Sequence, residues 1–442
     1  MIDPSEIAAA RLALGRLLAK CRRAAGLNQR DLAPHTYYGR STIANVETGR
    51  QNVPRAFWER CERALNADGC LLAAADHLEA LVQRQRQETA QLADDTALSA
   101  PARVLQALEI VMSDQADTLT IATDCLNELI SHYSEKLSVS PPTDMYDDLL
   151  NVRSYAGTLL ERLRSPTRHT RSDLIVAAGW LSNLLAVATS YMGDHGSALI
   201  WCVDAERRSY ESGYPDIAGW AALTRAMIAY YQGRAGRSIE LASNGQEVAP
   251  IGTIAHAKLA AQEMRARAML GDAEGMAQAK RRATKAIAVL PSDVATTGVF
   301  SIALSEDPQY TATSLLLVKR FREAASVTED VIQAAYPTGT RNRNRQSSSY
   351  ARTLLILGLA EAGLGHVDEA VAAGRAALNS TGVVWPTLVL AGKLDQTLMR
   401  LMRDHRDAAE VAEYHARYLD VAARASSEFQ HAGSAPASRG KK

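Results

Sequence analysis

The sequence is poor in aromatic residues and in long apolar runs, and both shortages limit what the chain can be. Aromatic residues make up 5% of the 442 residues. No apolar run reaches the roughly 18 residues that a membrane-spanning helix needs. The opening residues, MIDPSEIAAARLALGR, carry acids where a signal peptide would carry basic residues. These features predict a cytoplasmic location. The overall share of 47% apolar and 22% charged residues is ordinary for a folded chain.

The sequence also lacks cysteine motifs and enzyme signatures, and its net charge is zero. The cysteines, Cys21, Cys61, Cys70, Cys125 and Cys202, show neither CxxC spacing nor Cys/His ligand spacing, so we expect free thiols. The net charge is zero, so affinity for nucleic acid would have to come from a local excess of basic residues. There is no HExxH, GxxxxGK[ST] or GxSxG motif. The sequence therefore predicts no enzyme, no metal and no cofactor.

The first ninety residues, in contrast, carry clear helix signals. Alanine is abundant throughout, which favours helices, and 442 residues are enough for at least two domains. We expect a first helix that ends at Gly26 and a second that is capped by Asn28. A third helix begins at Gly39 or Arg40 and ends at Gly49. A fourth begins near Pro54, which is acceptable in a first turn.

Two of these helices, joined by a tight turn inside a small bundle, are typical of a helix-turn-helix. The sequence contains LNQRDLA, followed after nine residues by Ile43 and then by VETG. This pattern resembles the Cro and phage-repressor (XRE) family of DNA-binding domains. Tyr37 stands in place of the usual turn glycine. Gly39 stands where a variant common in actinobacterial members has serine. The resemblance implies that the second helix of the motif enters the major groove of DNA.

The helix spacing predicts which residues face the DNA. Ile43 and Val46 point into the bundle, which leaves the opposite face of the helix for base contacts. The predicted DNA-binding residues are Gln29, Arg40, Ser41, Ala44, Asn45, Arg50 and Arg55. An arginine can fork onto guanine, an asparagine can pair with adenine, and alanine leaves room for a thymine methyl group. Gln29 resembles the family's phosphate-contacting position, and Arg50 and Arg55, which flank the helix, are the other expected phosphate contacts. The alternative is that these side chains only cover a solvated helix.

Local charge agrees with DNA binding. Residues 1–63 hold eleven Lys or Arg and six Asp or Glu, an excess of five positive charges. We therefore place a helix-turn-helix domain at 1–68. A helical linker follows at 69–101, where Leu71, Ala75, Leu78 and Val82 form a heptad-like seam. This seam either makes a dimer contact or packs on the preceding bundle.

A repeat appears beyond residue 170. Turns recur at spacings of 40, 38, 48, 46 and 39 residues, at Gly193, Gly233, Gly271, Lys319, Gly365 and Asp404. A small residue follows five positions after most of them. Helix pairs with such a period are the signature of an α-solenoid, which we place at 102–428, with a disordered tail at 429–442. The stretch LLILGLAEAGLGHVDEAVAAGRAAL resembles a tetratricopeptide repeat. The predicted fold class is therefore all-α, with an N-terminal helix-turn-helix bundle followed by a tetratricopeptide-like α-solenoid.

In such a solenoid the first helix of each pair lines the concave side. The candidate ligand-binding residues on these helices are Trp180, Asn183, Trp220, Tyr230, Arg265 and Arg352. Aromatic rings with amide and guanidinium groups suit an extended peptide or a small amphipathic molecule. The alternative for the two tryptophans is ordinary packing between repeats.

The combination of the two parts resembles the peptide-responsive regulators of bacterial quorum sensing. It also resembles actinobacterial regulators of development and secondary metabolism. That likeness implies a homodimer on double-stranded DNA with a two-fold operator and an effector in the solenoid. The rival hypothesis is a protein-interaction scaffold or antitoxin whose main partner is another protein.

Overall fold

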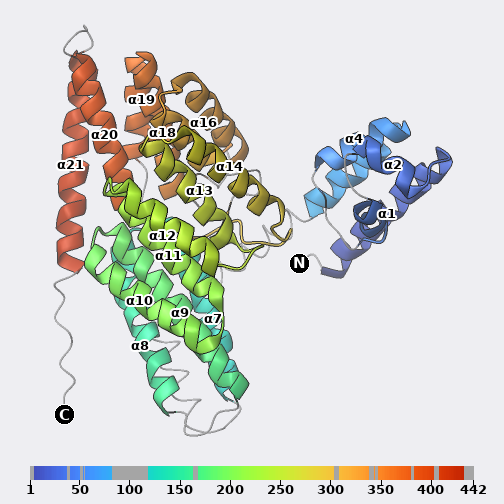
Figure 1. Cartoon of the computed structure of the whole chain (residues 1–442), viewed down its shortest axis with the longest axis horizontal. Helices are drawn as coiled ribbons and strands as arrows, with labels where there is room; N and C mark the ends of the chain where they lie inside the picture. Colours follow the sequence, from blue (N-terminus) through green and yellow to red (C-terminus); the bar gives the residue numbers. More distant parts are fainter. Residues whose placement is uncertain are drawn as a thin grey trace. The chain divides into compact units, whose positions relative to one another are not determined.

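The structure is a computed structural model, and it contains two compact units, residues 1–99 (unit 1) and 100–442 (unit 2). It describes residues 4–36, 40–49, 53, 55–81, 118–162, 168–302, 308–337, 343, 347–379, 383–402 and 408–432. Within these ranges the regular elements are helices, with no strand (Figure 1). The predicted all-α fold, a bundle followed by an α-solenoid, is confirmed.

Unit 1 is a small helical bundle. Its helices are α1 (Pro4–Ala24), α2 (Gln29–Thr36), α3 (Arg40–Glu47), α4 (Arg55–Leu65) and a further helix over 70–81. Its core includes Leu18, Leu32, Ile43 and Phe57, none of which has any exposed surface. Burial of such side chains stabilises the bundle by about 1.5–3 kcal/mol each.

The link between α1 and α2 follows the predicted signals. Gly26 has φ of 71°, the left-handed conformation that ends α1. The side-chain oxygen of Asn28 accepts hydrogen bonds from the backbone N–H groups of Arg30 and Asp31, at 2.8 and 3.0 Å. The carboxylate of Asp31 in turn accepts the backbone N–H of Asn28 at 2.9 Å. This reciprocal cap sets where α2 begins.

The helix over 70–81 belongs to the bundle. The carboxylate of Glu62, on α4, accepts the backbone N–H groups of Gly69, Leu71 and Leu72 at 2.7–3.0 Å, which caps this helix. Leu71 is completely buried, and Ala75 and Leu78 pack against the same core. The bundle therefore extends to at least residue 81, beyond the predicted boundary at 68. The seam from Leu71 to Leu78 packs on its own unit, and Val82 lies outside the described residues.

Unit 2 is a stack of helix pairs (Figure 1). The pairs are α7 (Thr118–Lys136) with α8 (Tyr146–Arg162), α9 (Arg168–Tyr191) with α10 (His195–Ser212), α11 (Pro215–Tyr231) with α12 (Ala235–Val248), α13 (Ile254–Met269) with α14 (Ala273–Ala288), α15 (Pro308–Leu317) with α16 (Phe321–Ala335), α18 (Ser347–Leu364) with α19 (Val367–Leu378), and α20 (Trp385–Met402) with α21 (Ala408–Ala432). A short 3-10 helix, η1 (Pro142–Asp144), precedes α8.

The predicted turns fall inside these pairs. Gly193, Gly233, Gly271, Lys319 and Gly365 each join the two helices of a pair, and each has a positive φ between 61° and 86°. Asp404 lies outside the described residues. The small residues that follow four of the turns, Ala198, Ser238, Ala324 and Ala370, are completely buried. They let the second helix approach the first closely, which confirms the repeat.

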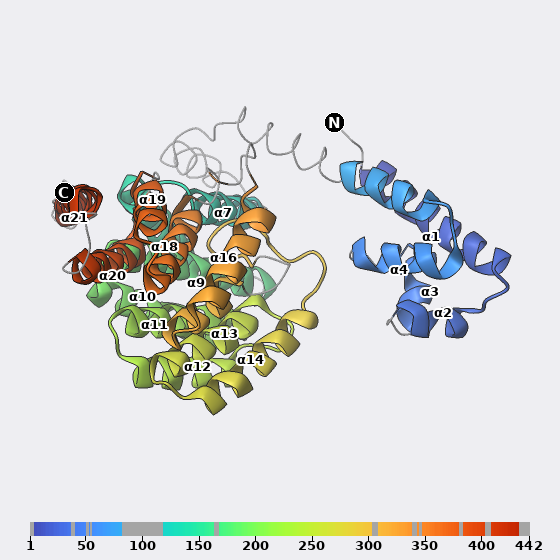
Figure 2. The ribbon, with the colours of Figure 1, turned by 90° about the horizontal axis from the view of Figure 1, so that it is seen from above.

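The stack closes on itself. The ring of Trp385, at the start of α20, lies 4.2 Å from the ring of His195, at the start of α10. The same tryptophan lies 5.9 Å from the ring of Tyr231, at the end of α11. Figure 2 shows the pairs following one another around unit 2. These contacts join the last helix pair to the second and third pairs and narrow the inner side of the solenoid.

Helix α9 combines length with an apolar composition. Its segment Arg171–Tyr191 is long and apolar enough to cross a membrane by length and composition, although no single apolar run in the sequence suggested this. In the structure 78% of that window is buried inside the protein. Its polar residues Ser182 and Asn183 are completely buried too. Such burial is that of a core helix in a folded unit.

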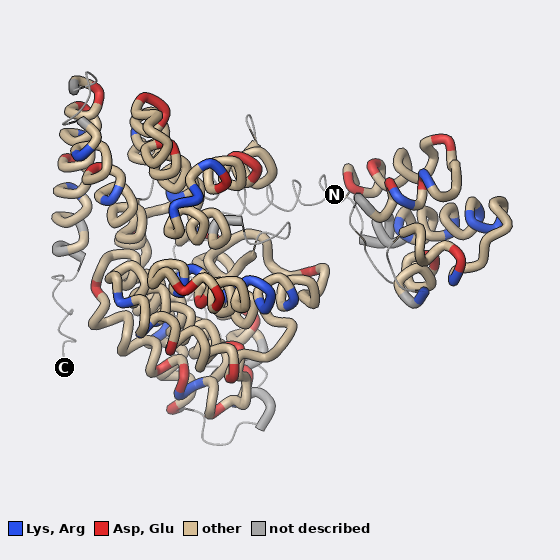
Figure 3. The backbone as a smooth tube through the Cα atoms, turned by 45° about the horizontal axis from the view of Figure 1, so that its top comes forward, with Lys and Arg blue, Asp and Glu red and all other residues tan. Residues whose placement is uncertain are grey.

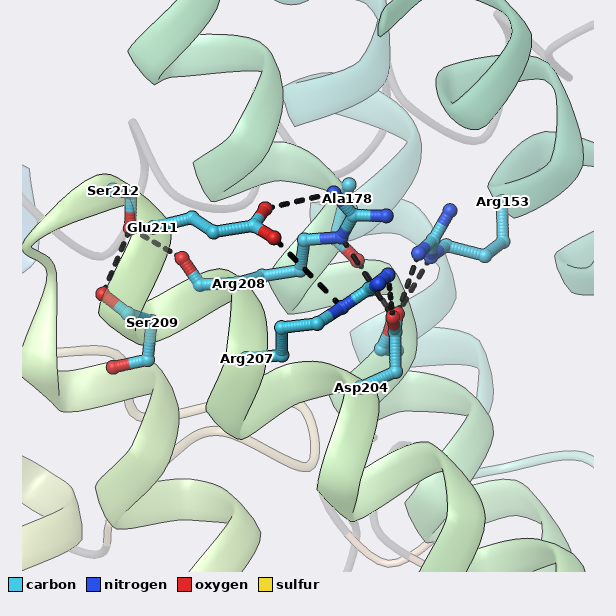
Figure 4. Close-up of polar contacts among 9 residues, drawn as sticks. Arg153, Ala178, Asp204, Arg207, Arg208, Ser209, Glu211 and Ser212 are labelled. Carbon is cyan, nitrogen blue, oxygen red and sulfur yellow. Dashed lines mark hydrogen bonds and ion pairs between the residues drawn. The ribbon is translucent and has the colours of Figure 1, made fainter. Parts of the chain in front are cut away.

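A buried polar network joins α8, α9 and α10 (Figure 4). Arg153 donates to the hydroxyl of Ser182 at 2.8 Å and to the carboxylate of Asp204 at 2.5 Å. Ser182 donates to the same carboxylate at 2.7 Å. Burial opposes ionisation of Asp204, but the bonds from Ser182 and Arg153, with the charges of Arg153 and Arg208, bring its pKa below 3.8. Along the backbone of unit 2, Lys and Arg residues are interspersed with Asp and Glu residues (Figure 3).

Candidate DNA-binding surface and solenoid cavity

Helix α3 is fixed to its neighbours by an ion pair with little exposure to solvent. Arg22, near the end of α1, donates two hydrogen bonds to the carboxylate of Glu47 at 2.6 and 2.9 Å. The two side chains are 10% and 7% exposed. The side-chain amide of Gln29, at the start of α2, donates to the same carboxylate at 2.7 Å. One carboxylate thus ties α1, α2 and α3 together and sets the orientation of α3.

Helix α3 also lies unusually close to α1. A Cβ atom on Gly15 would be only 2.3 Å from the carbonyl oxygen of Val46. Val46 itself is 2% exposed and Ile43 is completely buried. The inner face of α3 is therefore the predicted one, and its position depends on a glycine in α1.

The outer face of α3 carries the predicted base contacts. Arg40, the first residue of α3, and Asn45 are exposed, and Ala44 between them is half-buried. Arginine and asparagine on the first turns of such a helix reach base edges when the helix enters the major groove. The side chains of Ser41 and Arg55, and all of Arg50, lie outside what the structure describes.

Two residues of α2 add detail that the sequence did not provide. Gln29, a predicted phosphate contact, uses its amide nitrogen to hold Glu47. The next residue, Arg30, is exposed in the first turn of α2. An exposed arginine at a helix N-terminus beside the groove-reading helix is well placed for a phosphate. In the sequence, the position of Arg30 within the motif LNQRDLA was the one feature that pointed to a phosphate contact.

Unit 2 contains a cavity of about 140 Å³ on its inner side. The helical walls come from α9, α11, α13, α15, α18 and α20, which are all first helices of their pairs. This agrees with the expectation that first helices line the concave side. The segment 298–301, between α14 and α15, also lines the cavity.

Four of the predicted ligand residues meet in this cavity, and two do not. Trp220, Tyr230, Arg265 and Arg352 line it. Asn183 is completely buried elsewhere, and its side-chain amide donates to the carbonyl oxygen of Ile217 at 3.0 Å. Its role is to link α9 to the start of α11, so the structure corrects its assignment.

Trp180 does not line the cavity either, because Phe300 of the same chain packs against it. The ring of Phe300 lies between the two predicted tryptophans, 4.9 Å from the ring of Trp180 and 5.0 Å from that of Trp220. Val299 is held in place because its backbone N–H donates to the carbonyl oxygen of Ser134 at 3.0 Å. The cleft where an extended peptide was expected to lie is thus filled by residues 298–302. No signal in the sequence marked this segment.

Arg265 is the most buried cation of the cavity wall, with 6% exposure. Its guanidinium group lies 4.2 Å from the ring centre of Tyr230 and 4.4 Å from that of Tyr310. Its Nε donates to Gln262 at 2.6 Å. Its Nη2 is buried and has no hydrogen-bond partner within the described part of the chain.

Arg352 faces the same cavity from α18. It donates to the hydroxyl groups of Ser348 and Ser349 at 3.2 and 3.0 Å, both of which are neutral. Burial lowers the pKa of Arg265 and of Arg352, but the surrounding tyrosines outweigh burial and raise both above the ordinary value. Both groups are therefore cations at neutral pH.

The described residues of the cavity wall carry no matching negative charge. Lys258 joins Arg265 and Arg352 there, and no Asp or Glu is among the described residues that line the cavity. The remaining wall is aromatic, hydroxylic or aliphatic. Within the described residues there is also no group of three or more His, Cys, Asp or Glu side chains that could hold a metal.

The comparison with protein families agrees with the geometry of unit 1. Residues 13–75 match the family described as a helix-turn-helix domain. Unit 1 carries a helix-turn-helix domain. The matched range runs past residue 68 into the helix over 70–81, as the packing of Leu71 requires. DNA binding is the function that such a domain supports.

Comparisons over the whole chain are less informative. No curated protein matches it. Similar solved structures include a human IFIT1 dimer with m7Gppp-AAAA, at 12% identity, 96% coverage of both chains and a TM-score of 0.33. Another is a monomeric IFIT1 mutant with Gppp-AAAA, at 12% identity, 98% coverage of this chain, 95% of the other and a TM-score of 0.28. Likenesses at these TM-scores carry no argument about function.

Proposed function

We propose that this protein is a sequence-specific, DNA-binding transcription regulator of the XRE type. The observation that carries the proposal is the exposed face of α3, with Arg40 and Asn45 on a helix whose other face is buried in the bundle. Arg40 would read a guanine and Asn45 an adenine, while Arg30 would hold a phosphate. The proposal includes a cytoplasmic location and no catalytic activity.

Selection from a random pool of double-stranded DNA tests this proposal directly. The full chain should enrich one sequence. Arg40→Ala should then relax the preference at one base pair, at a cost of about 1–3 kcal/mol. Arg30→Ala should weaken all sequences alike and flatten the dependence of affinity on salt. Arg237→Ala, an exposed arginine of α12 in unit 2, is the control and should change neither. A pool that shows no enrichment contradicts the proposal.

We also propose that the regulator acts as a homodimer. One helix-turn-helix domain reads only half of a typical operator, and a dimer supplies the second half-site. Because the heptad-like seam packs on its own bundle, the contact is proposed for unit 2. Helix α10 exposes Ile200, Val203 and Tyr210 at 68%, 53% and 91%, a stripe of apolar side chains on its outer face.

Light scattering at micromolar concentration tests the dimer. Ile200→Glu should lower the measured mass to that of one chain, whereas Val248→Glu, which changes an apolar side chain 49% exposed on α12, should not. If the parent chain is monomeric with and without its DNA, the dimer proposal is wrong. The same stripe favours the second candidate function, a scaffold or antitoxin that binds another protein. If the parent chain is monomeric and binds another protein, and if Ile200→Glu abolishes that binding, the scaffold or antitoxin function is supported.

Finally, we propose that an effector in the cavity of unit 2 alters DNA binding. A ligand can shift DNA affinity only by its different affinity for the two forms of the protein, and a tenfold shift needs about 1.4 kcal/mol. The quorum-sensing likeness favours a peptide as effector. The cavity favours a small molecule, because residues 298–302 occupy the cleft that a peptide would need.

A further inference from the structure

We infer that the cavity of unit 2 binds a small organic anion, a carboxylate or phosphate monoester on an aromatic or apolar body, through Arg265 and Arg352. This names the chemical class of the effector and so deepens the proposed function, although binding in the cavity does not itself require that the protein bind DNA.

The first argument is the unfilled bonding capacity of Arg265. Three tyrosine rings lie close to the guanidinium group, Tyr230 at 4.2 Å, Tyr310 at 4.4 Å and Tyr231 at 5.3 Å, and its hydrogen bonds form at the edge of the group. One edge position bonds Gln262, and Nη2 is buried without a partner among the described residues. A buried cationic donor without an acceptor costs free energy. An anion that binds at the guanidinium group of Arg265, which lines the cavity, would supply an acceptor and remove that cost.

The second argument is that the cavity differs from other arginine sites of unit 2, because none of its described lining residues is Asp or Glu. Other arginines of unit 2 with limited exposure do have acidic partners. Arg153 bonds Asp204, Arg225 bonds Glu206 at 2.5 Å, and Arg267 bonds Glu263 at 2.7 Å. In the cavity, by contrast, Arg352 bonds two serine hydroxyls and Arg265 bonds an amide. The missing negative charge is therefore expected from a ligand.

The third argument concerns size and shape. A volume of about 140 Å³ corresponds to room for on the order of ten water molecules, which is the scale of a small metabolite. The wall beside the cations includes the rings of Trp220, Tyr191 and Trp385, with Leu390 among the aliphatic side chains. Such a wall accepts an apolar or aromatic body while guanidinium groups take the charged end.

The test measures binding to the full chain with defined probe molecules. The anions are benzoate, phenylacetate and phenyl phosphate, and the neutral controls of matched shape are benzamide and phenylacetamide. Binding is followed by tryptophan fluorescence, since Trp220 and Trp385 line the cavity, and by the rise in melting temperature. At least one anion should bind at least tenfold more tightly than the neutral molecules. If no anion exceeds them, the inference is overturned.

Variants then tie the preference to the two arginines. Arg265→Gln and Arg352→Gln should each reduce anion affinity at least tenfold and leave the neutral molecules unaffected. Arg237→Gln, which changes an exposed arginine paired with Glu240, should bind as the parent does. If Arg265→Gln does not fold, Arg265→Lys and Arg352→Gln decide the matter. Parent-like anion binding by the folded cavity variants would also overturn the inference.

The same proteins separate this inference from the proposed function. A protein that prefers anions but enriches no DNA sequence would support the cavity site and contradict the regulator. A protein that enriches one DNA sequence but shows no preference for anions would support the regulator and contradict the cavity site. If both activities are present, the anion should change DNA affinity in the parent and not in Arg352→Gln.

Discussion

Replacement of Glu47 by alanine is the sharpest test of how the DNA-binding surface is held. Glu47 accepts two hydrogen bonds from Arg22 and one from Gln29. With 10% exposure of its side chain, Arg22 would keep its charge but lose its counter-ion. Removal of one partner of a buried ion pair costs about 3–5 kcal/mol. That is a large part of the 5–15 kcal/mol that typically stabilises a domain. We therefore expect Glu47→Ala to open unit 1 and to abolish DNA binding.

Hydrogen exchange of the full chain can measure this cost in each unit separately. A loss of about 3 kcal/mol corresponds to roughly a hundredfold faster exchange of the protected amides in α1 to α4. Amides of α9 and α11, in unit 2, should exchange as in the parent. Glu79→Ala, which removes an exposed carboxylate on the helix over 70–81, is the control and should stay within about 0.5 kcal/mol.

A double variant tests the reasoning behind the magnitude. If the cost comes from a stranded charge, Arg22→Met combined with Glu47→Met should restore most of the lost stability, because neither charge remains. The reasoning is refuted if Glu47→Ala costs less than about 1 kcal/mol, or if the double variant is as unstable as Glu47→Ala.

Three further predictions concern stability and the position of α3. The pKa of Asp204 is depressed in the folded protein, so its contribution is complete above pH 3.8 and disappears as the pH falls through the lower folded value. Urea midpoints should therefore show Asp204→Asn less stable than the parent at pH 7, with the gap narrowing towards pH 2; a constant gap would contradict this. Lys319→Gly should raise the free energy of unfolding by up to about 1 kcal/mol, and with it the melting temperature, because Lys319 has φ of 61° where four other turns use glycine. A lower melting temperature refutes this prediction. Gly15→Ala should push α3 from α1 and weaken DNA binding, because its Cβ would lie 2.3 Å from the carbonyl oxygen of Val46; unchanged affinity refutes it.

The helix-turn-helix could be predicted because its signals are local. The glycine that ends α1, the reciprocal cap of Asn28 and Asp31, and the inward spacing of Ile43 and Val46 all lie within a few residues of the feature they specify. Glu47 was visible as part of VETG, but its bonds to Arg22 and Gln29 span 25 and 18 residues. Its bracing role therefore required the packed bundle.

In the solenoid, the sequence by itself determined the helix pairs and which helix of each pair faces inward, because turn glycines and small residues act within one pair. Only the tertiary structure decided what the inner side contains. Closure of the stack brings Trp385 against His195, and the segment around Phe300 fills the cleft between Trp180 and Trp220. These contacts join residues about 80 to 190 positions apart, and no periodicity encodes them. They turned an expected peptide groove into a small cavity whose described wall carries Arg265 and Arg352 but no carboxylate.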